Sequence, residues 1–163
     1  MFRNFKKMSG SKTVRFHHRV SCTLRADGYI YMNSFSREKR KPGYYGTGPF
    51  ARISIESTAD ELGNEIMSVK TGCSIVDDIG DPVAAIMPLY DLAGVSDHRV
   101  FYKNSKTVNI SFKAEEITLR AFRSVRGQSV SVPEAHQDVA IDISPEALGK
   151  AVVSVFDKVE RCV

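Results

Sequence analysis

The C-terminal stretch 138–163 constrains the fold most strongly, because it predicts a strand followed directly by a capped helix. Its first part alternates apolar with small or polar residues, the period of a half-buried strand, at Val139, Ile141 and Ile143. Ser144 then occupies the expected N-cap position, and Pro145 the first helical position, where no backbone N–H is needed. An apolar stripe follows at helical spacing: Leu148, Val152, Val155, Phe156 and Val159.

A weaker copy of this unit lies within 51–71. It has alternating residues at Ile53 and Ile55 and a predicted capping box of Thr58 and Glu61. Its helical stripe comprises Leu62, Ile66 and Val69. The alternative is a coincidence between two amphipathic helices.

Both predicted helices carry a glycine in their first turns, Gly63 after Leu62 and Gly149 after Leu148. A glycine in a helix costs about 1 kcal/mol relative to alanine. Two such losses at one offset predict that a strand backbone passes close to each helix. We therefore expect two strand–cap–helix units packed on one sheet.

The length and composition fit one soluble domain, 1–163, with 1–12 as a flexible arm. Hydrophobic residues make up 42% and charged residues 26% of the chain. No apolar run approaches the roughly 18 residues of a membrane span. The basic N-terminus is followed by no apolar run and is not a secretory signal, so we expect a cytoplasmic protein without membrane contact.

The three cysteines, Cys22, Cys73 and Cys162, are widely spaced and form no Cys-x-x-Cys motif. We expect reduced, small apolar residues, in keeping with a cytoplasmic location. Cys73 and Cys162 each follow one of the predicted helices, so a pairing of these two is the alternative.

The remaining pattern predicts short strands and hairpins. Asp27-Gly28 separates two strand-like runs, and Arg126-Gly127 follows a segment, 114–125, for which a strand is favoured over a helix. A further hairpin is expected over 73–87 with an acidic tip, and short strands over 100–102 and 108–112. The fold class is therefore α+β, a mostly antiparallel twisted sheet with two main helices packed on it.

The least regular stretch is 36–49, which combines basic residues with glycine, proline and two adjacent tyrosines. Its glycines and prolines exclude a helix or a central strand. Exposed aromatic residues beside arginine are typical of binding hot spots, so the candidate contacts are Arg37, Arg40, Tyr44 and Tyr45. The alternative is a solvated basic loop whose tyrosines cover the sheet edge. Asp77 and Asp78 form a second candidate patch.

No catalytic or metal-binding motif is present. The four histidines, His17, His18, His98 and His136, show no metal-ligand spacing, and Asp77, Asp78 and Asp81 do not fit a calcium loop. The segment 43–48 is rich in glycine but lacks the ending of a phosphate-binding loop. We expect no catalytic residue, no metal and no cofactor; an enzyme whose site residues are scattered in sequence is a minor alternative.

The charge balance leaves a second class of function open. The net charge is +4 and the pI is about 9.0, and arginines alternate with aromatic residues in 15–19 and 120–123. Such patterns are typical of single-stranded nucleic-acid binding. Acidic residues total 19, however, and no basic run is long, so nucleic acid is the less favoured partner.

The segment 139–152 resembles the closing strand and helix of the immunity proteins of bacterial contact-dependent growth inhibition systems. The similarity lies in the alternating strand, the cap Ser144-Pro145-Glu146 and the Leu148-Gly149 pair. The resemblance implies a non-catalytic protein that binds the C-terminal toxin domain, often a nuclease, of its cognate exported adhesin. It carries over no contact residue. The basic surface favours an acidic toxin patch or pairing through a sheet edge over mimicry of nucleic-acid charge.

Overall fold

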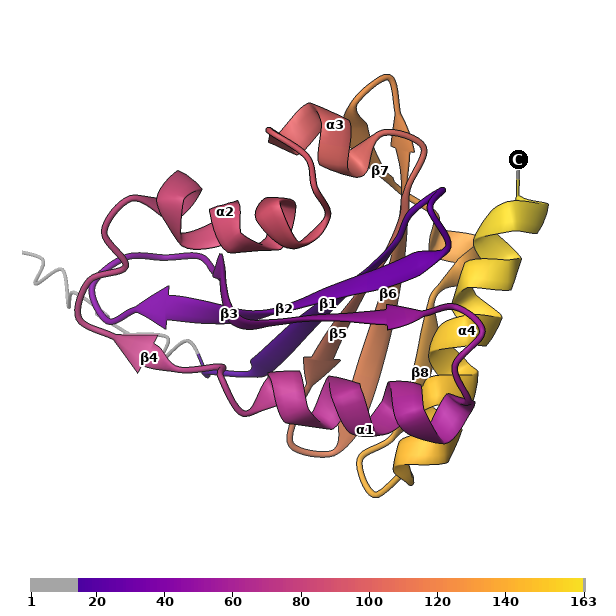
Figure 1. Ribbon diagram of the computed structural model, residues 1–163. Coiled ribbons are helices and arrows are strands. Elements are labelled where there is room, and N and C mark those ends of the chain that lie inside the picture. Colours follow the sequence, from indigo (N-terminus) through magenta and orange to yellow (C-terminus); the bar gives the residue numbers. More distant parts are fainter. Residues whose placement is uncertain (1–14, 163) are drawn as a thin grey trace, which may run out of the picture.

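The computed structural model describes residues 15–162; the expected arm 1–12 lies outside this range. The elements, in chain order, are β1 (His18–Leu24), β2 (Tyr29–Glu38), β3 (Tyr45–Ser54), α1 (Ala59–Lys70), β4 (Ile75–Val76), α2 (Pro82–Leu92), α3 (His98–Tyr102), β5 (Lys106–Phe112), β6 (Glu116–Val125), β7 (Gln128–Ser131), the 3₁₀ turn η1 (Pro133–Ala135), β8 (Gln137–Ala140) and α4 (Pro145–Arg161). The α+β class is confirmed (Figure 1).

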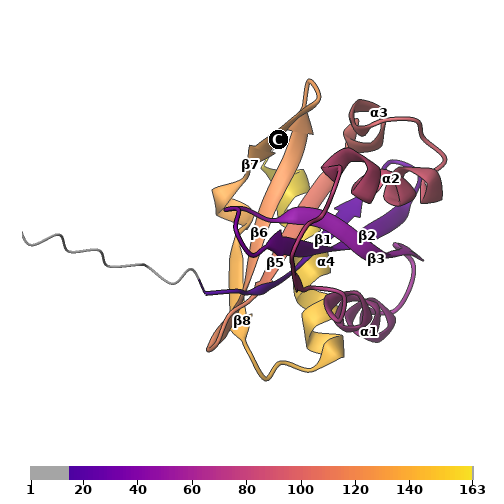
Figure 2. The ribbon, with the colours of Figure 1, turned by 90° about the vertical axis from the view of Figure 1, so that its left-hand side faces the viewer.

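One twisted sheet runs through the molecule in the order β3-β2-β1-β5-β6-β7 (Figures 1 and 2). These neighbours are antiparallel; β8 adds to β6 in the same sense, and β4 pairs with β2 in parallel. The hairpins expected at Asp27-Gly28 and Arg126-Gly127 are confirmed. Gly28 has a φ of +81°, and both Arg126 and Gly127 have positive φ, as tight hairpin turns require.

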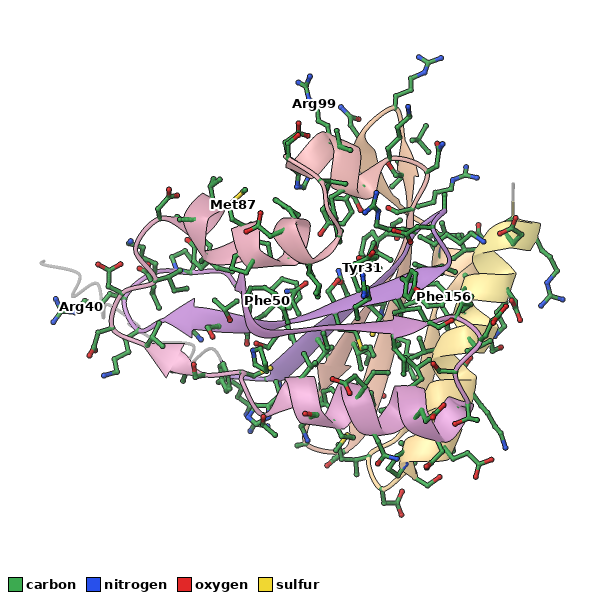
Figure 3. The ribbon with its side chains drawn as sticks, viewed as in Figure 1. Tyr31, Arg40, Phe50, Met87, Arg99 and Phe156 are labelled. Atoms are coloured by element: carbon green, nitrogen blue, oxygen red, sulfur yellow. The ribbon has the colours of Figure 1, made fainter. Side chains whose placement is uncertain are left out.

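The main core lies between one face of the sheet and the two long helices, α1 and α4. Strand alternation directs residues such as Cys22, Met32 and Ile110 into it, and Phe156 of α4 is also fully buried there (Figure 3). The two expected strand–cap–helix units are β3–α1 and β8–α4, and both helices contact the same sheet face. Strand β8 ends at Ala140, earlier than the alternation through Ile143 indicated.

Both helix starts are capped as predicted. The Thr58 hydroxyl accepts a bond from the Glu61 N–H at 3.2 Å, and the Glu61 carboxylate accepts one from the Thr58 N–H at 2.8 Å. The Ser144 hydroxyl accepts a bond from the Ala147 N–H at 3.1 Å. A local signal within four residues therefore fixes where each helix begins.

The expected strand near the two helical glycines is wrong; the neighbour of each helix is the other helix. A Cβ on Gly63 would lie 1.7 Å from the Pro145 carbonyl oxygen, and one on Gly149 would lie 1.9 Å from that of Ala59. The first turns of α1 and α4 thus cross in backbone contact. The glycines are needed because any side chain there would separate the helices.

A second layer, α2 and α3, covers part of the other sheet face (Figure 1). The hairpin expected over 73–87 is wrong, because only Ile75–Val76 of it forms a strand, β4, which pairs with β2, and 82–87 belongs to α2. The strand expected over 100–102 is wrong as well, because these residues belong to α3. The Asp81 carboxylate caps α2 by accepting from the Val83 N–H at 2.9 Å, and Asp97 caps α3 by accepting from the Val100 N–H at 3.0 Å. A small second core joins these helices to β2: Tyr31, Leu89, Tyr90 and Phe101.

The irregular region 36–49 contains more strand than expected. Strand β2 continues to Glu38, and β3 already begins at Tyr45, so only the residues between them form a turn. Proline is tolerated at Pro49 because β3 is an edge strand. The pairing of β2 with β3 also shifts in register near this residue, between Asn33 and Ser34 of β2. The part that contains the glycines and prolines, 42–49, forms no central strand, whereas Ser36–Glu38 belongs to β2, which lies between β3 and β1.

All three cysteines are free thiols, so the alternative pairing of Cys73 with Cys162 is wrong. Cys73 follows the C-terminal end of α1 and Cys162 that of α4, whereas the two helices meet at their N-terminal turns. Among residues 15–162 no helix has the length and apolar character needed to cross a bilayer.

Candidate functional site

The sheet face opposite the main core carries small polar side chains at its centre. The alternation of β1 directs Val20 and Cys22 into the main core and Ser21 and Thr23 to this opposite face. The β1–β5 register places Ser21 opposite Asn109 and Thr23 opposite Thr107. The two threonine hydroxyls lie 3.1 Å apart and bond to each other.

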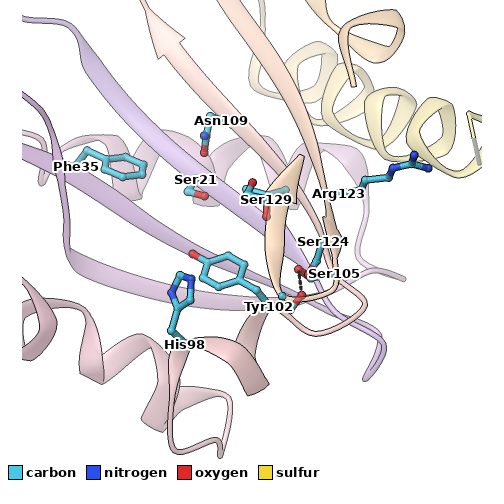
Figure 4. Close-up of a pocket in the computed structure, with 11 residues that line it drawn as sticks. Ser21, Phe35, His98, Tyr102, Ser105, Asn109, Arg123, Ser124 and Ser129 are labelled. Atoms are coloured by element: carbon cyan, nitrogen blue, oxygen red, sulfur yellow. Dashed lines mark hydrogen bonds between the residues drawn. The ribbon is translucent and has the colours of Figure 1, made fainter. Parts of the chain in front are cut away.

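A hollow of about 190 Å³ opens above these residues, between α3 and the β6–β7 hairpin (Figure 4). We call it the polar hollow. It is lined by Ser21, Phe35, His98, Tyr102, Ser105, Thr107, Asn109, Arg123, Ser124, Gly127 and Ser129. Seven of these eleven residues carry a hydroxyl or amide group, and they come from β1, β5, β6, β7, α3 and the turn before β5.

Helix α3 contributes the two ring systems at the rim, His98 and Tyr102, whose centroids lie 4.6 Å apart. His98 Nδ1 and the Tyr90 hydroxyl bond at 3.1 Å, which ties α3 to α2. Burial raises the pKa of Tyr102 to about 12, and burial together with the charge of Asp97 raises the pKa of Tyr90. Both phenols thus stay neutral and serve as hydrogen-bonding groups.

The polar hollow presents groups that can form hydrogen bonds to a ligand. Its lining residues, all in the described part of the chain, include no carboxylate that could work with His98 as an acid–base pair. Residues 15–162 also contain no group of three or more His, Cys, Asp or Glu placed to hold a metal ion. Hydroxyl and amide groups both donate and accept, as a peptide ligand requires.

Strand β7 borders the polar hollow and forms a free edge of the sheet. All four of its residues are exposed, and within residues 15–162 it pairs only with β6. Its register, Val125 opposite Gln128, directs the N–H groups of Gln128 and Val130 toward β6 and those of Ser129 and Ser131 outward. An incoming strand could bond to this edge.

The two predicted contact patches lie together, away from the polar hollow. Parallel pairing of β4 with β2 places Asp77 beside the turn that follows Arg37, and Lys39 Nζ lies 2.7 Å from Asp77 Oδ1. Arg40 projects from this end of the molecule (Figure 3). The Asp78 carboxylate accepts a bond from the Gly80 N–H.

The two tyrosines of the predicted patch are half-buried. The Tyr44 ring stacks on Phe16 at 6.1 Å, lies 3.9 Å from the Arg19 guanidinium carbon, and its hydroxyl accepts a bond from the His17 N–H. Tyr45 begins β3 opposite Ser36. Tyr44 thus packs against residues 16–19 at the start of the described chain.

The basic–aromatic motif 15–19 lies elsewhere, in an open hollow of about 470 Å³. This basic hollow is lined by Arg15, Phe16, His17, His18, Lys70, Phe112, Lys113, Ala114 and Ile141. Lys70 Nζ lies 4.5 Å from the Phe112 ring centre. Burial and the neighbouring Lys70 lower the pKa of His18.

Sequence reasoning missed the residues of the polar hollow. One sequence signal was present. Ser21 and Thr23 in β1, and Thr107 and Asn109 in β5, place polar side chains on the strand face opposite the apolar residues. The signal does not tell which strands are neighbours. His98 begins α3, and its place there depends on the Asp97 cap.

No protein-family model and no curated protein matches the chain. Solved structures do match. A protein of unknown function, NMB0488 from Neisseria meningitidis, superposes with a TM-score of 0.70 at 14% identity, covering 88% of this chain and 95% of that one. A chain of the CdiA-CT/CdiI toxin and immunity complex from Yersinia pseudotuberculosis gives a TM-score of 0.68 at 14% identity, covering 88% of this chain and 98% of that one. The chain therefore has the fold of these two proteins over nearly their whole length.

Proposed function

We propose that this chain is an immunity protein that binds and neutralises the C-terminal toxin domain, a nuclease, of a contact-dependent growth inhibition adhesin. The observation that carries the proposal is the shared fold with a chain of a CdiA-CT/CdiI toxin and immunity complex. The strand, cap and helix at 139–152, which resemble the ending of such immunity proteins, support it independently. The action is binding in the cytoplasm, without a cofactor.

The polar hollow and the free edge of β7 are the surface that we propose for the toxin. An added strand would bond to the outward N–H and C=O groups of Ser129 and Ser131, while its side chains enter the hollow beside Ser21 and Asn109. Backbone bonds supply affinity in this mode, and the hollow supplies specificity. The predicted contact patches around Arg40 and Asp77 are a second proposed contact with the toxin.

Co-expression with the toxin domain encoded immediately upstream tests the function. We expect growth to be restored by this chain and not by an immunity protein of another system. Purified toxin and immunity protein should also form a complex on size exclusion. Equal killing by the toxin with and without this chain would refute the proposal.

The basic hollow favours a second candidate function, binding of single-stranded nucleic acid. Arg15 and Lys70 line it together with Phe16, and cations beside an aromatic ring can neutralise phosphate while a base stacks on the ring. This candidate predicts oligonucleotide binding that weakens steeply between about 50 mM and 200 mM salt. The absence of binding at the lower salt concentration excludes it, and Lys70→Gln should weaken any binding that occurs.

A further inference from the structure

Helix α2 is an apolar helix that the protein itself only partly covers. Between Asp81 and Asp91 its sequence contains no charged residue, yet only Leu89 and Tyr90 are buried. Val83 is 65% exposed, the highest value among the large apolar side chains of residues 15–162. Apolar surface left in water on one continuous helix is typical of a protein interaction site.

The exposed side of α2 forms a groove with the segment that leads into α3. The groove has a volume of about 440 Å³ and is lined by Pro82, Val83, Ile86, Met87, Tyr90, Ser96, Asp97 and His98. Helical spacing places Val83, Met87 and Asp91 in one row, so the apolar row ends in a carboxylate. His98 lines this groove and also the polar hollow, so the two hollows adjoin at this residue.

The segment that carries this groove differs in charge sign from the whole protein, although Arg25 Nη1 lies 3.5 Å from the Ala93 carbonyl oxygen just after α2. The stretch 71–98 contains five aspartates and no lysine or arginine, although the chain as a whole has a net charge of +4. Asp77 is neutralised by Lys39, but Asp81, Asp91 and Asp97 lie in or next to the groove. The Val100 N–H holds the pKa of Asp97 below its usual value, which keeps this carboxylate ionised. The next two residues along the chain, His98 and Arg99, are basic.

We propose that the α2 groove binds an apolar segment of the toxin domain that carries lysine or arginine at its ends. This inference rests on the proposed function and adds the face and the chemistry of the partner. A nuclease needs basic residues to bind phosphates, and these complement the aspartates at the groove. A second copy of this chain fits less well, because a two-fold contact through α2 would place aspartates opposite aspartates.

Two substitutions separate the apolar and the electrostatic parts of this contact. Val83→Glu places a charge in the apolar row at an exposed position, and we expect the dissociation constant for the purified toxin domain to rise about 100-fold. Asp91→Lys should weaken binding about tenfold at about 50 mM salt and much less at about 500 mM salt, because salt screens exposed charges. Thermal unfolding of each variant checks that the fold is retained.

Matched control variants change the same residue types far from α2. Ile141→Glu replaces another exposed apolar residue and Asp142→Lys another exposed aspartate, both in the turn before α4. Neither should alter toxin binding. If folded Val83→Glu and Asp91→Lys bind the toxin like the wild type, the groove proposal is wrong while the proposed function stands. If the wild type itself does not bind the toxin, both proposals fail together.

Discussion

Gly63 lies against the first turn of the helix that contains Gly149, and Gly149 lies against the first turn of the helix that contains Gly63. The contacting atoms are the backbone carbonyls of Pro145 and Ala59. Because each glycine lacks a side chain, the backbone of the other helix can approach it closely. This reciprocal contact fixes how α1 and α4 cross beneath the sheet and so how the main core closes.

Gly63→Ala should lower the free energy of unfolding by about 1–3 kcal/mol, because overpacking outweighs the gain of about 1 kcal/mol in helix propensity. Gly149→Ala should behave alike, since both clashes are with backbone. The combined variant should lose less than the sum, because separating the helices relieves both clashes. Urea unfolding measures this. Ser68→Ala, on the exposed side of α1, is the control and should shift stability by about 0.5 kcal/mol or less.

Acid should weaken the α1 cap through Glu61. The backbone N–H and the hydroxyl of Thr58 hold the pKa of Glu61 below its ordinary value of 4.5. The stabilisation is therefore fully present above pH 4.5 and is lost as the pH falls through the lower folded-state value. Glu61→Gln should flatten the decline of the urea midpoint in this range, whereas Glu65→Gln on the same helix should not. An unchanged decline in Glu61→Gln would contradict the capping role.

Alkali should act on the polar hollow through Tyr102, whose pKa burial raises from 10.0 to about 12. A raised phenol pKa means that stability is complete below pH 10 and is lost as the pH approaches 12. Ultraviolet titration of the wild type and Tyr102→Phe should show that the missing phenol ionises last. Tyr29→Phe, which removes an exposed tyrosine, should leave the last-ionising phenol in place. Loss of an early-ionising phenol in Tyr102→Phe would contradict the burial.

Thiol reactivity should separate the three cysteines. Cys162 is exposed, whereas Cys22 is fully buried and burial raises its pKa. The Cys73 thiol is buried as well and donates to the Arg19 carbonyl at 2.9 Å. Ellman's reagent should therefore titrate one thiol in the folded protein and all three after denaturation. Cys162→Ser should abolish the fast reaction; if it does not, a second thiol is accessible.

Substitution at the free edge of β7 tests the proposed strand pairing. Ser129→Pro removes an outward N–H without removing a bond to β6, so stability should change little while toxin binding weakens about tenfold. Ser129→Ala keeps the N–H and should bind like the wild type. Calorimetry with the purified toxin domain measures both variants. Equal affinity of Ser129→Pro and the wild type would place the toxin contact elsewhere.

Some features could be predicted because they depend on residues close together in the sequence. Interactions over at most a few residues form the caps at Thr58 and Ser144 and the turns at Asp27-Gly28 and Arg126-Gly127. The α4 stripe is a repeat along a single helix. The segment 82–87 is misassigned for a related reason. Val83, Ala85 and Met87 alternate like a strand, whereas the Asp81 cap and the proline after it start a helix. Short apolar runs satisfy both periods.

The sequence by itself determined the α+β class, the strand–cap–helix units and the places where these helices begin, because capping and side-chain periodicity act along the chain. Only the tertiary structure decided that α1 and α4 cross at two glycines, that Asp77 lies beside Lys39, and that the polar hollow forms. Ser21 and Asn109 meet because β1 and β5 pair. Several strands have similar patterns and could pair with β1, so the packing of the whole core, rather than either strand alone, determines which strands pair.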